Sequence, residues 1–248
     1  MTLPVDDRLV TVIKQERAGE GVYALSLHCP SASVSAIPGQ FVLIRDPSWG
    51  MDPLLMRPFA VAGVWEDRLE VVYRTVGRGT ERLSRCLPGD ELLLRGPVGR
   101  GFRAPASPPI YVAGTLGVAP LLFARQIFGG GRFILGVPDA SWAPFVRWVL
   151  ERCPEVEVFC DDGTIGTKGS ALRGMSSGES SPILACGPMG MMTAMSSMDL
   201  VDVQVSLENR MACGIGACCG CVTAAEYGHL RVCAQGPVFD LKELRHHG

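Results

Sequence analysis

Four cysteines near the C-terminus have the type and spacing of iron-sulfur ligands. Cys213, Cys218 and Cys221 form the pattern C-x4-C-x2-C, and Cys233 follows after a short polar, hairpin-like insert. Plant-type ferredoxins begin their 2Fe-2S site with this spacing and take the last cysteine from elsewhere in the chain. Glycines between the cysteines let the backbone bend closely around inorganic sulfide and point amide groups at the sulfurs. The sequence therefore predicts a 2Fe-2S cluster on these four thiolates.

Structural zinc and disulfide bonds are the alternatives for these cysteines. Zinc ligands usually stand in two separated C-x2-4-C knuckles, whereas three cysteines crowd one glycine-rich loop here. Disulfides are typical of secreted chains, which this one does not resemble. Cys219 is a further cysteine in the loop that the ligand spacing does not use. We expect it to point away from the cluster, and an exchange of ligands stays open.

Two arginine-containing segments are suited to a phosphate-bearing cofactor. In R-P-F-A, residues 57–60, a guanidinium stands beside a rigid proline, which favours bidentate capture of a phosphate. In Y-R-T-V-G-R-G-T, residues 73–80, an aromatic ring can stack, and the amides at a helix start can hold pyrophosphate. Either segment alone also fits a surface ion pair or an ordinary turn. Both segments precede a nucleotide-type domain in the chain, and this order favours the cofactor-binding interpretation.

Later turns have the composition of a dinucleotide site. A-G-T-L-G-V-A-P, residues 113–120, follows an apolar run and opens a helix, so Gly114 and Gly117 let the backbone approach a pyrophosphate. A plain strand-to-helix turn is the alternative. A-C-G-P-M at 185–189 and D-D-G-T-I-G-T-K-G at 161–169 also follow apolar runs. Open parallel sheets bind ligands at this carboxyl edge of their strands.

The elements that must position these motifs follow from the apolar pattern. Six short apolar runs separated by Gly, Pro and Asp predict an antiparallel β-barrel over residues 1–104. The proline-rich segment 103–109 marks a boundary. Strand-like and helix-like runs then alternate over 105–206, which predicts an α/β nucleotide-binding domain with a parallel sheet. The cysteine-containing segment 207–248 forms the third part.

Composition excludes several classes of function. The 248-residue chain is 47% hydrophobic and carries a formal net charge of −2, so neither nucleic acid nor an anionic membrane is an expected partner. We find no uninterrupted apolar run of membrane-spanning length. The N-terminus lacks the basic and apolar regions of a signal peptide. We therefore expect a cytoplasmic protein.

The order of these motifs resembles the ferredoxin-reductase superfamily of flavin enzymes. With S-L-E-N-R-M-A-C-G-I-G-A-C-C-G-C and V-C-A-Q-G-P-V-F, the chain is similar over nearly its whole length to the electron transfer subunits of NAD-linked dihydroorotate dehydrogenase B. The resemblance implies an oxidoreductase subunit of pyrimidine biosynthesis with FAD, a 2Fe-2S cluster and NAD as cofactors. Its partner would be an FMN-containing catalytic subunit, in a heterotetramer with two copies of each.

The resemblance also implies individual contacts. The cluster would lie on the four cysteines, and the orotate site on the partner, so no catalytic residue is expected in this chain. FAD is expected at Arg57, Pro58, Phe59, Ala60, Val72, Tyr73, Arg74, Gly79 and Thr80, and the nicotinamide nucleotide at Gly114, Thr115, Gly117, Cys186, Gly187 and Pro188. Ala60 stands where the family usually has Ser or Thr, and Thr115-Leu116 replaces smaller residues of the family's turn.

The implied electron path runs from the FMN subunit through the cluster and FAD to NAD+. A flavin belongs between the other two because hydride transfer moves two electrons and a 2Fe-2S cluster carries one. Asp139, with no arginine cluster nearby in sequence, favours NAD over NADP, although it also fits a helix N-cap. The alternatives are a FAD and 2Fe-2S subunit of a sulfhydrogenase or ferredoxin:NADP reductase type of complex, and a non-enzymatic zinc-binding protein.

Overall fold

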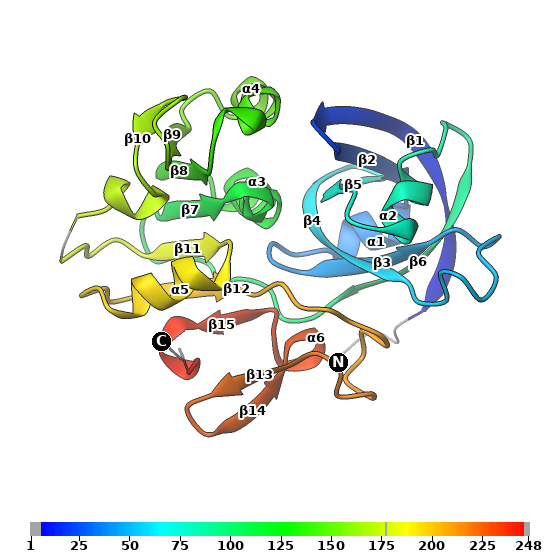
Figure 1. Cartoon of the computed structure of the whole chain (residues 1–248). Coiled ribbons are helices and arrows are strands. Elements are labelled where there is room, and N and C mark those ends of the chain that lie inside the picture. The colour runs from blue at the N-terminus through cyan, green and yellow to red at the C-terminus, as the bar shows by residue number, and fades with distance from the viewer. Residues whose placement is uncertain (1–5, 177, 246–248) are drawn as a thin grey trace.

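The N-terminal part of the chain forms the predicted antiparallel barrel (Figure 1). The computed structural model describes residues 6–176 and 178–245. The closed barrel has the strand order β1-β2-β5-β4-β3-β6. Its strands are β1 (Asp7–Gly19), β2 (Val22–His28), β3 (Phe41–Arg45), β4 (Arg57–Trp65), β5 (Arg68–Arg74) and β6 (Glu91–Val98), with the short helices α1 (Pro30–Ser35) and α2 (Arg78–Leu83). Helix α1 has no counterpart in the sequence prediction.

The barrel strands include both alternating and continuous buried positions: β3 and β5 are buried along most of their length, whereas β6 alternates. In β6 every second residue from Leu92 to Val98 is buried. A period of two places that set on the inner face of the sheet. Phe123 of the next part belongs to the same buried cluster, so the barrel interior continues into the neighbouring domain.

The second part is the predicted parallel sheet, of order β10-β9-β8-β7-β11-β12-β15. Its strands are β7 (Ile110–Gly114), β8 (Arg132–Val137), β9 (Glu157–Cys160), β10 (Thr167–Lys168), β11 (Ile183–Cys186), β12 (Val203–Ser206) and β15 (Val238–Asp240). Helices α3 (Val118–Phe128) and α4 (Ala143–Arg152) pack on the barrel side, and α5 (Met189–Ser196) covers the other face. Strand β7 is buried at all five positions because both faces of the sheet are covered.

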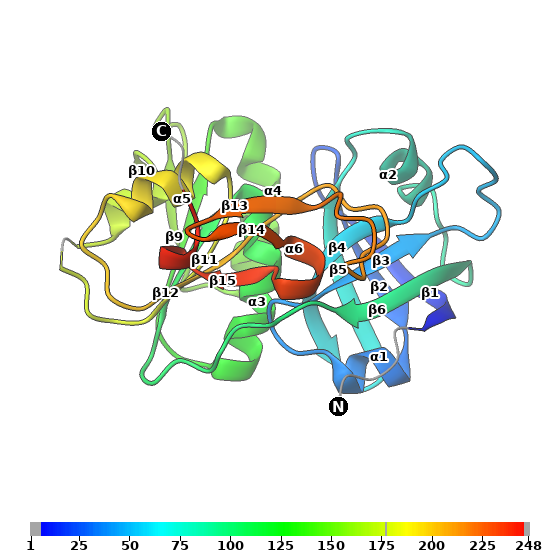
Figure 2. The ribbon, with the colours of Figure 1, turned by 90° about the horizontal axis from the view of Figure 1, so that it is seen from below.

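The third part crosses beneath both domains (Figure 2). It contains the hairpin β13 (Val222–Ala225) and β14 (Gly228–Arg231), the short helix α6 (Val232–Gln235) and strand β15. Strand β15 pairs antiparallel with β12, so the wholly parallel sheet expected from the sequence gains one antiparallel edge. The Arg100 amide also donates to the Gly236 carbonyl at 2.5 Å, next to the exit of the barrel.

The predicted domain limits 1–104, 105–206 and 207–248 stay predictions, and residues 1–5 and 246–248 lie outside the described part. The described helices include none with the length and apolarity needed to cross a membrane. Single 3-10 turns at 115–117, 140–142, 171–174 and 241–243 complete the structure.

Candidate cofactor sites

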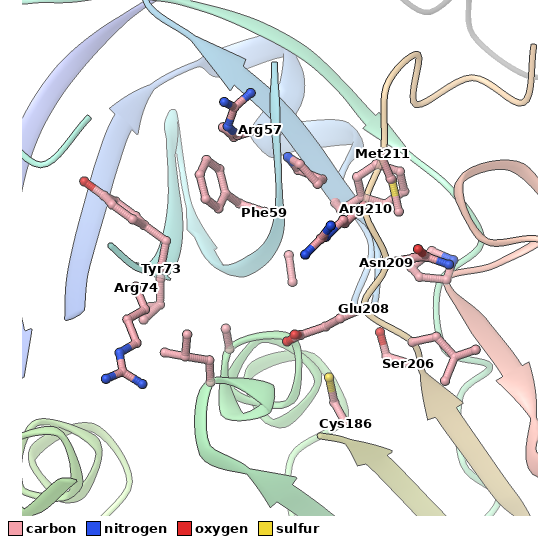
Figure 3. Close-up of a pocket in the computed structure, with 18 of the residues that line it drawn as sticks. Arg57, Phe59, Tyr73, Arg74, Cys186, Ser206, Glu208, Asn209, Arg210 and Met211 are labelled. Carbon is pink, nitrogen blue, oxygen red and sulfur yellow. The ribbon is translucent and has the colours of Figure 1, made fainter. Parts of the chain in front are cut away.

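A cavity of about 720 Å³ lies where the three parts of the chain meet (Figure 3). Strands β4 and β5 and helix α2 form one wall, the turns after β7 and β11 form another, and residues 206–211 form the third. Nine of the residues singled out from the sequence line it: Arg57, Pro58, Phe59, Ala60, Val72, Tyr73, Arg74, Thr80 and Cys186. Two motifs that are remote in sequence therefore share one cavity.

The arginines and aromatic rings of the barrel wall are held by neighbouring side chains. The Arg57 guanidinium lies 5.9 Å from the Trp49 ring centroid, and a Cβ on Gly79 would come within 2.5 Å of Arg57 Nε. Gly79 therefore lies against the Arg57 side chain and does not itself line the cavity. Arg74 lies 5.3 Å from the Trp142 ring. Burial, followed by the charge of Arg78, lowers the pKa of Arg57, so the wall concentrates positive charge suited to phosphate.

Tyr73 and Thr80 shape this wall with hydroxyls that point into the protein. The Tyr73 hydroxyl donates to Gln15 Oε1 at 2.9 Å, and burial raises its pKa. Its ring packs on Phe59 at 5.2 Å, so the ring is what can contact a ligand. The Thr80 hydroxyl accepts the Val76 amide at 2.9 Å and donates to the Gly77 carbonyl. These bonds hold the start of α2.

The glycine turn after β7 and the A-C-G-P segment after β11 touch each other. A Cβ on Gly117 would lie 2.1 Å from the Cys186 carbonyl oxygen, and one on Gly114 would lie 2.6 Å from Pro188 Cδ. Neighbouring parallel strands bring the two turns to one edge. Thr115 has a φ of 49°, which is uncommon for a β-branched residue. In this group Cys186 reaches the cavity, together with Leu116.

The third wall was missed by sequence reasoning. Glu208, Asn209, Arg210 and Met211 line the cavity between β12 and the cysteines. The available signal was the polar triplet Glu208-Asn209-Arg210, which begins two residues after the buried strand β12, at the edge where parallel sheets bind ligands. Figure 3 shows the Glu208 carboxylate directed into the cavity above Cys186. Although Glu208 is exposed to the cavity, desolvation by the surrounding protein raises the pKa of its carboxyl group.

The raised pKa of Glu208 predicts that the stability of the fold depends on pH, and this can be tested. A carboxyl group with a raised pKa in the folded chain stabilises the fold below its unfolded pKa, near 4.5, and that contribution is lost as the pH rises through the folded value. Because Gln stays neutral, we expect Glu208→Gln to unfold at a progressively higher temperature than the natural chain as the pH rises above the unfolded pKa of glutamate, near 4.5. Thermal unfolding across this range measures the difference. A constant difference, or an equal trend for Glu226→Gln on the exposed hairpin, contradicts it.

The four predicted ligand cysteines are surrounded by backbone amides. We call residues 212–221 the cluster loop. Each of the four sulfurs accepts at least one N–H: Cys213 from Ile215 at 3.5 Å and Cys218 at 3.4 Å, Cys218 from Gly220 at 3.4 Å, Cys221 from Cys233 at 3.3 Å, and Cys233 from Gly216 at 3.1 Å. Amides aimed at sulfur are the hydrogen bonds that iron-sulfur sites use. These residues fit a 2Fe-2S cluster.

Cys219 differs from the four predicted ligands in its hydrogen bonds. It is exposed, has a φ of 53°, and accepts no N–H at its sulfur among the hydrogen bonds of the described residues. The pKa values of the predicted ligands differ, and burial raises that of Cys233 to about 12. Burial raises the pKa of Cys213, but amides led by that of Ile215 outweigh it and lower the pKa to about 6. Within residues 6–176 and 178–245, no three His, Cys, Asp or Glu side chains stand close enough to hold a single metal ion. The fit therefore rests on the amide donors.

Comparison with known proteins identifies the family. Residues 208–245 match the family model of the iron-sulfur cluster binding domain of dihydroorotate dehydrogenase B. The dihydroorotate dehydrogenase B (NAD(+)) electron transfer subunit of Clostridium acetobutylicum is 32% identical over 238 residues, covering 94% of this chain and 95% of that protein. The chain belongs to this family. The family member from Desulforamulus reducens is 36% identical over 236 residues, 88% of this chain and 90% of that protein.

Solved structures confirm the fold of this dihydroorotate dehydrogenase B family member. The structure of an NADH-dependent reduced ferredoxin-NADP oxidoreductase, described for flavin-based electron bifurcation, aligns with a TM-score of 0.82 at 28% identity, covering 96% of this chain and 90% of that one. A ferredoxin NADP+ reductase from Neisseria gonorrhoeae with bound FAD and NADP aligns with a TM-score of 0.63 at 16% identity, covering 81% of this chain and 99% of that one. The second likeness shows the fold alone.

Proposed function

We propose that this chain is the electron transfer subunit of a dihydroorotate dehydrogenase B and carries electrons from a dihydroorotate-oxidising partner to NAD+. The observation that carries the proposal is the continuity of the third cavity wall with the cluster loop. Met211 lines the cavity, and Cys213 follows two residues later. Residues suited to a flavin nucleotide and to a cluster therefore belong to one connected site.

Three sets of residues would hold the groups. Arg57 and Arg74 offer charge to the phosphates of FAD, and Phe59 and Tyr73 offer aromatic surface. Cys213, Cys218, Cys221 and Cys233 would bind the cluster, and Gly114, Thr115, Gly117, Cys186, Gly187 and Pro188 would receive the nicotinamide nucleotide. When bound, FAD exchanges between hydride and single-electron transfer, and the cluster carries single electrons. The chain's own task is to hold these groups together and exclude water from the space between them.

The geometry at the end of β8 supports NAD over NADP. Asp139 follows this strand, and its carboxylate accepts the Ser141 amide at 2.8 Å. Asp161 follows β9 at the same edge. Negative charge at this edge disfavours the extra phosphate of NADP. The N-cap role considered for Asp139 is therefore real, and it leaves the carboxylate charge in place.

The partner and the compartment belong to the same proposal. The partner is an FMN-containing subunit that oxidises dihydroorotate, joined in a complex with two copies of each chain. All ten cysteines lie in the described part and none forms a disulfide. Reduced cysteines are typical of the cytoplasm, where we place the complex.

Cofactor analysis tests the proposal directly. Protein purified without oxygen should contain FAD, about two iron and about two acid-labile sulfide per chain, the contents of one 2Fe-2S cluster. With the partner added it should reduce NAD+ when dihydroorotate is supplied. A colourless protein with one zinc would contradict the proposal and support the zinc-binding alternative.

A second candidate is a FAD and 2Fe-2S subunit of a ferredoxin-linked complex. It is favoured by the likeness, at a TM-score of 0.82, to the NADH-dependent reduced ferredoxin-NADP oxidoreductase. The same protein, purified with FAD and the cluster, can be used to distinguish the two candidate functions. Copurification with a partner active on reduced ferredoxin, and none on dihydroorotate, would establish the second candidate.

A further inference from the structure

Arg231 contacts the cluster loop from the end of β14. Its Nη1 donates to the Gly216 carbonyl at 2.9 Å. Gln235 Oε1 accepts the Arg231 backbone amide at 2.9 Å and its Nε at 3.4 Å, which holds the half-buried side chain in place. A planar guanidinium held at Nε has a restricted orientation, which directs its Nη1 toward the Gly216 carbonyl. The position of the Gly216 carbonyl is therefore set from outside the loop.

Gly216, whose carbonyl accepts from Arg231, also contacts a cysteine sulfur. Gly216 donates its own N–H to Cys233 Sγ at 3.1 Å. This N–H belongs to the peptide before the carbonyl that Arg231 holds, so the two groups are joined through the Cα atom of Gly216. Gly216 has a φ of 83°, a conformation that glycine adopts readily. Arg231 on the carbonyl therefore limits the orientations open to Gly216 and to its N–H.

Arg231 differs from the other arginine that contacts the loop. Arg95 donates to the Cys213 carbonyl at 3.0 Å, but its Nε and Nη2 also bind the two carboxylate oxygens of Asp7 at 2.5 and 2.7 Å. The Asp7 charge offsets that of Arg95. Among the ion pairs of the described residues, none includes Arg231. Its positive charge beside the loop is uncompensated.

We propose that Arg231 is a positioning residue that raises the reduction potential of the cluster. It acts by fixing Gly216, whose amide donates to Cys233, and by placing a positive charge outside any ion pair beside the loop. Reduction adds one electron and therefore one negative charge to the cluster, which such a charge and such an amide favour. This inference rests on the proposed function, because it requires a 2Fe-2S cluster on these cysteines.

A redox titration of the loaded protein tests this role. Arg231→Met removes the charge and the donors, whereas Arg231→Lys keeps a charge and a donor. Arg245→Met is the matched control, because Arg245 also donates to a backbone carbonyl of the hairpin, that of Glu226 at 2.9 Å, and has no contact with the loop among its described hydrogen bonds. Electron paramagnetic resonance of the reduced cluster reports the potential, and iron, sulfide and FAD contents report loading.

We expect Arg231→Met to lower the equilibrium constant for reduction at least about tenfold, which is about 59 mV for one electron. Arg231→Lys and Arg245→Met should stay within about threefold of the natural chain, a change smaller than 59 mV. Loss of the cluster from Arg231→Met alone, with FAD retained, also supports the positioning role. A fully loaded Arg231→Met with an unchanged potential overturns it, as does an equal shift in Arg245→Met. A natural chain without iron and sulfide overturns the proposed function itself.

Discussion

Substitution of Cys221 by serine is expected to remove the cluster and reduce electron flow from the partner to the background of the assay. Cys221 is 2% exposed, and its sulfur accepts the Cys233 amide. It is therefore buried next to another of the four predicted ligands. Three remaining thiolates cannot satisfy a cluster that needs four. The residues that would hold FAD, such as Arg57 and Tyr73, lie in β4 and β5 and not in the cluster loop, so NADH-driven reduction of an artificial acceptor should largely remain.

The neighbouring cysteine supplies the matched control. Cys219 is exposed, and no amide donates to its sulfur among the hydrogen bonds of the described residues. Cys219→Ser should therefore keep iron, sulfide and partner-dependent activity. Visible absorption and partner-linked turnover measure both variants. If Cys221→Ser keeps FAD but loses the artificial acceptor activity as well, the proposed order of carriers is wrong.

Gly117→Ala is expected to disrupt the nicotinamide site and leave the flavin and cluster in place. Its Cβ would lie 2.1 Å from the Cys186 oxygen and 2.9 Å from the Gly187 nitrogen, which are backbone atoms. Strand β11 is paired on both sides and cannot retreat. Overpacking of this kind costs about 1–3 kcal/mol. If the turn shifts to relieve the overpacking, the binding of NADH loses a free energy of similar size. We then expect the KM for NADH to rise by about tenfold or more.

Gly190→Ala separates this clash from the mere addition of a methyl group. A Cβ on Gly190, in helix α5, meets no atom within 4 Å. Because alanine favours helix more than glycine, this variant should be stabilised by up to about 1 kcal/mol. NADH titrations and thermal unfolding compare the two. Equal behaviour of the variants would show that the close approach at Gly117 does not shape the site.

The fold was predictable because its signals are local and strong. Short apolar runs between turn residues mark the barrel strands, and buried runs alternate with helical ones in the second part. Strand β10 has two residues and strand β15 has three, which is too short for a recognisable periodicity. The segment that contains β15 was interpreted from its cysteines and not from its apolar pattern. The antiparallel edge of the sheet depends on a long-range pairing that no local pattern contains.

The parts of the site that consist of short sequence motifs could be predicted. The arginine and glycine motifs located the barrel wall, and the cysteine spacing located the loop. Glu208 to Met211 escaped because polar residues after a strand look like any loop until the three parts are brought together. The inward hydroxyl of Tyr73 could not be predicted either, because its partner Gln15 lies on another strand of the barrel. The contacts assigned residue by residue to FAD and NAD stay predictions.

The return of the chain at Gly236 to the exit of the barrel has a consequence for turnover. The Arg100 and Gly236 backbones are joined there, and Gln126 of α3 bonds both backbone groups of Val64 in β4. Both sets of hydrogen bonds would have to break before the barrel could separate from helix α3 and from the C-terminal segment during a catalytic cycle. Nucleotide exchange by movement of loops and side chains would leave them intact.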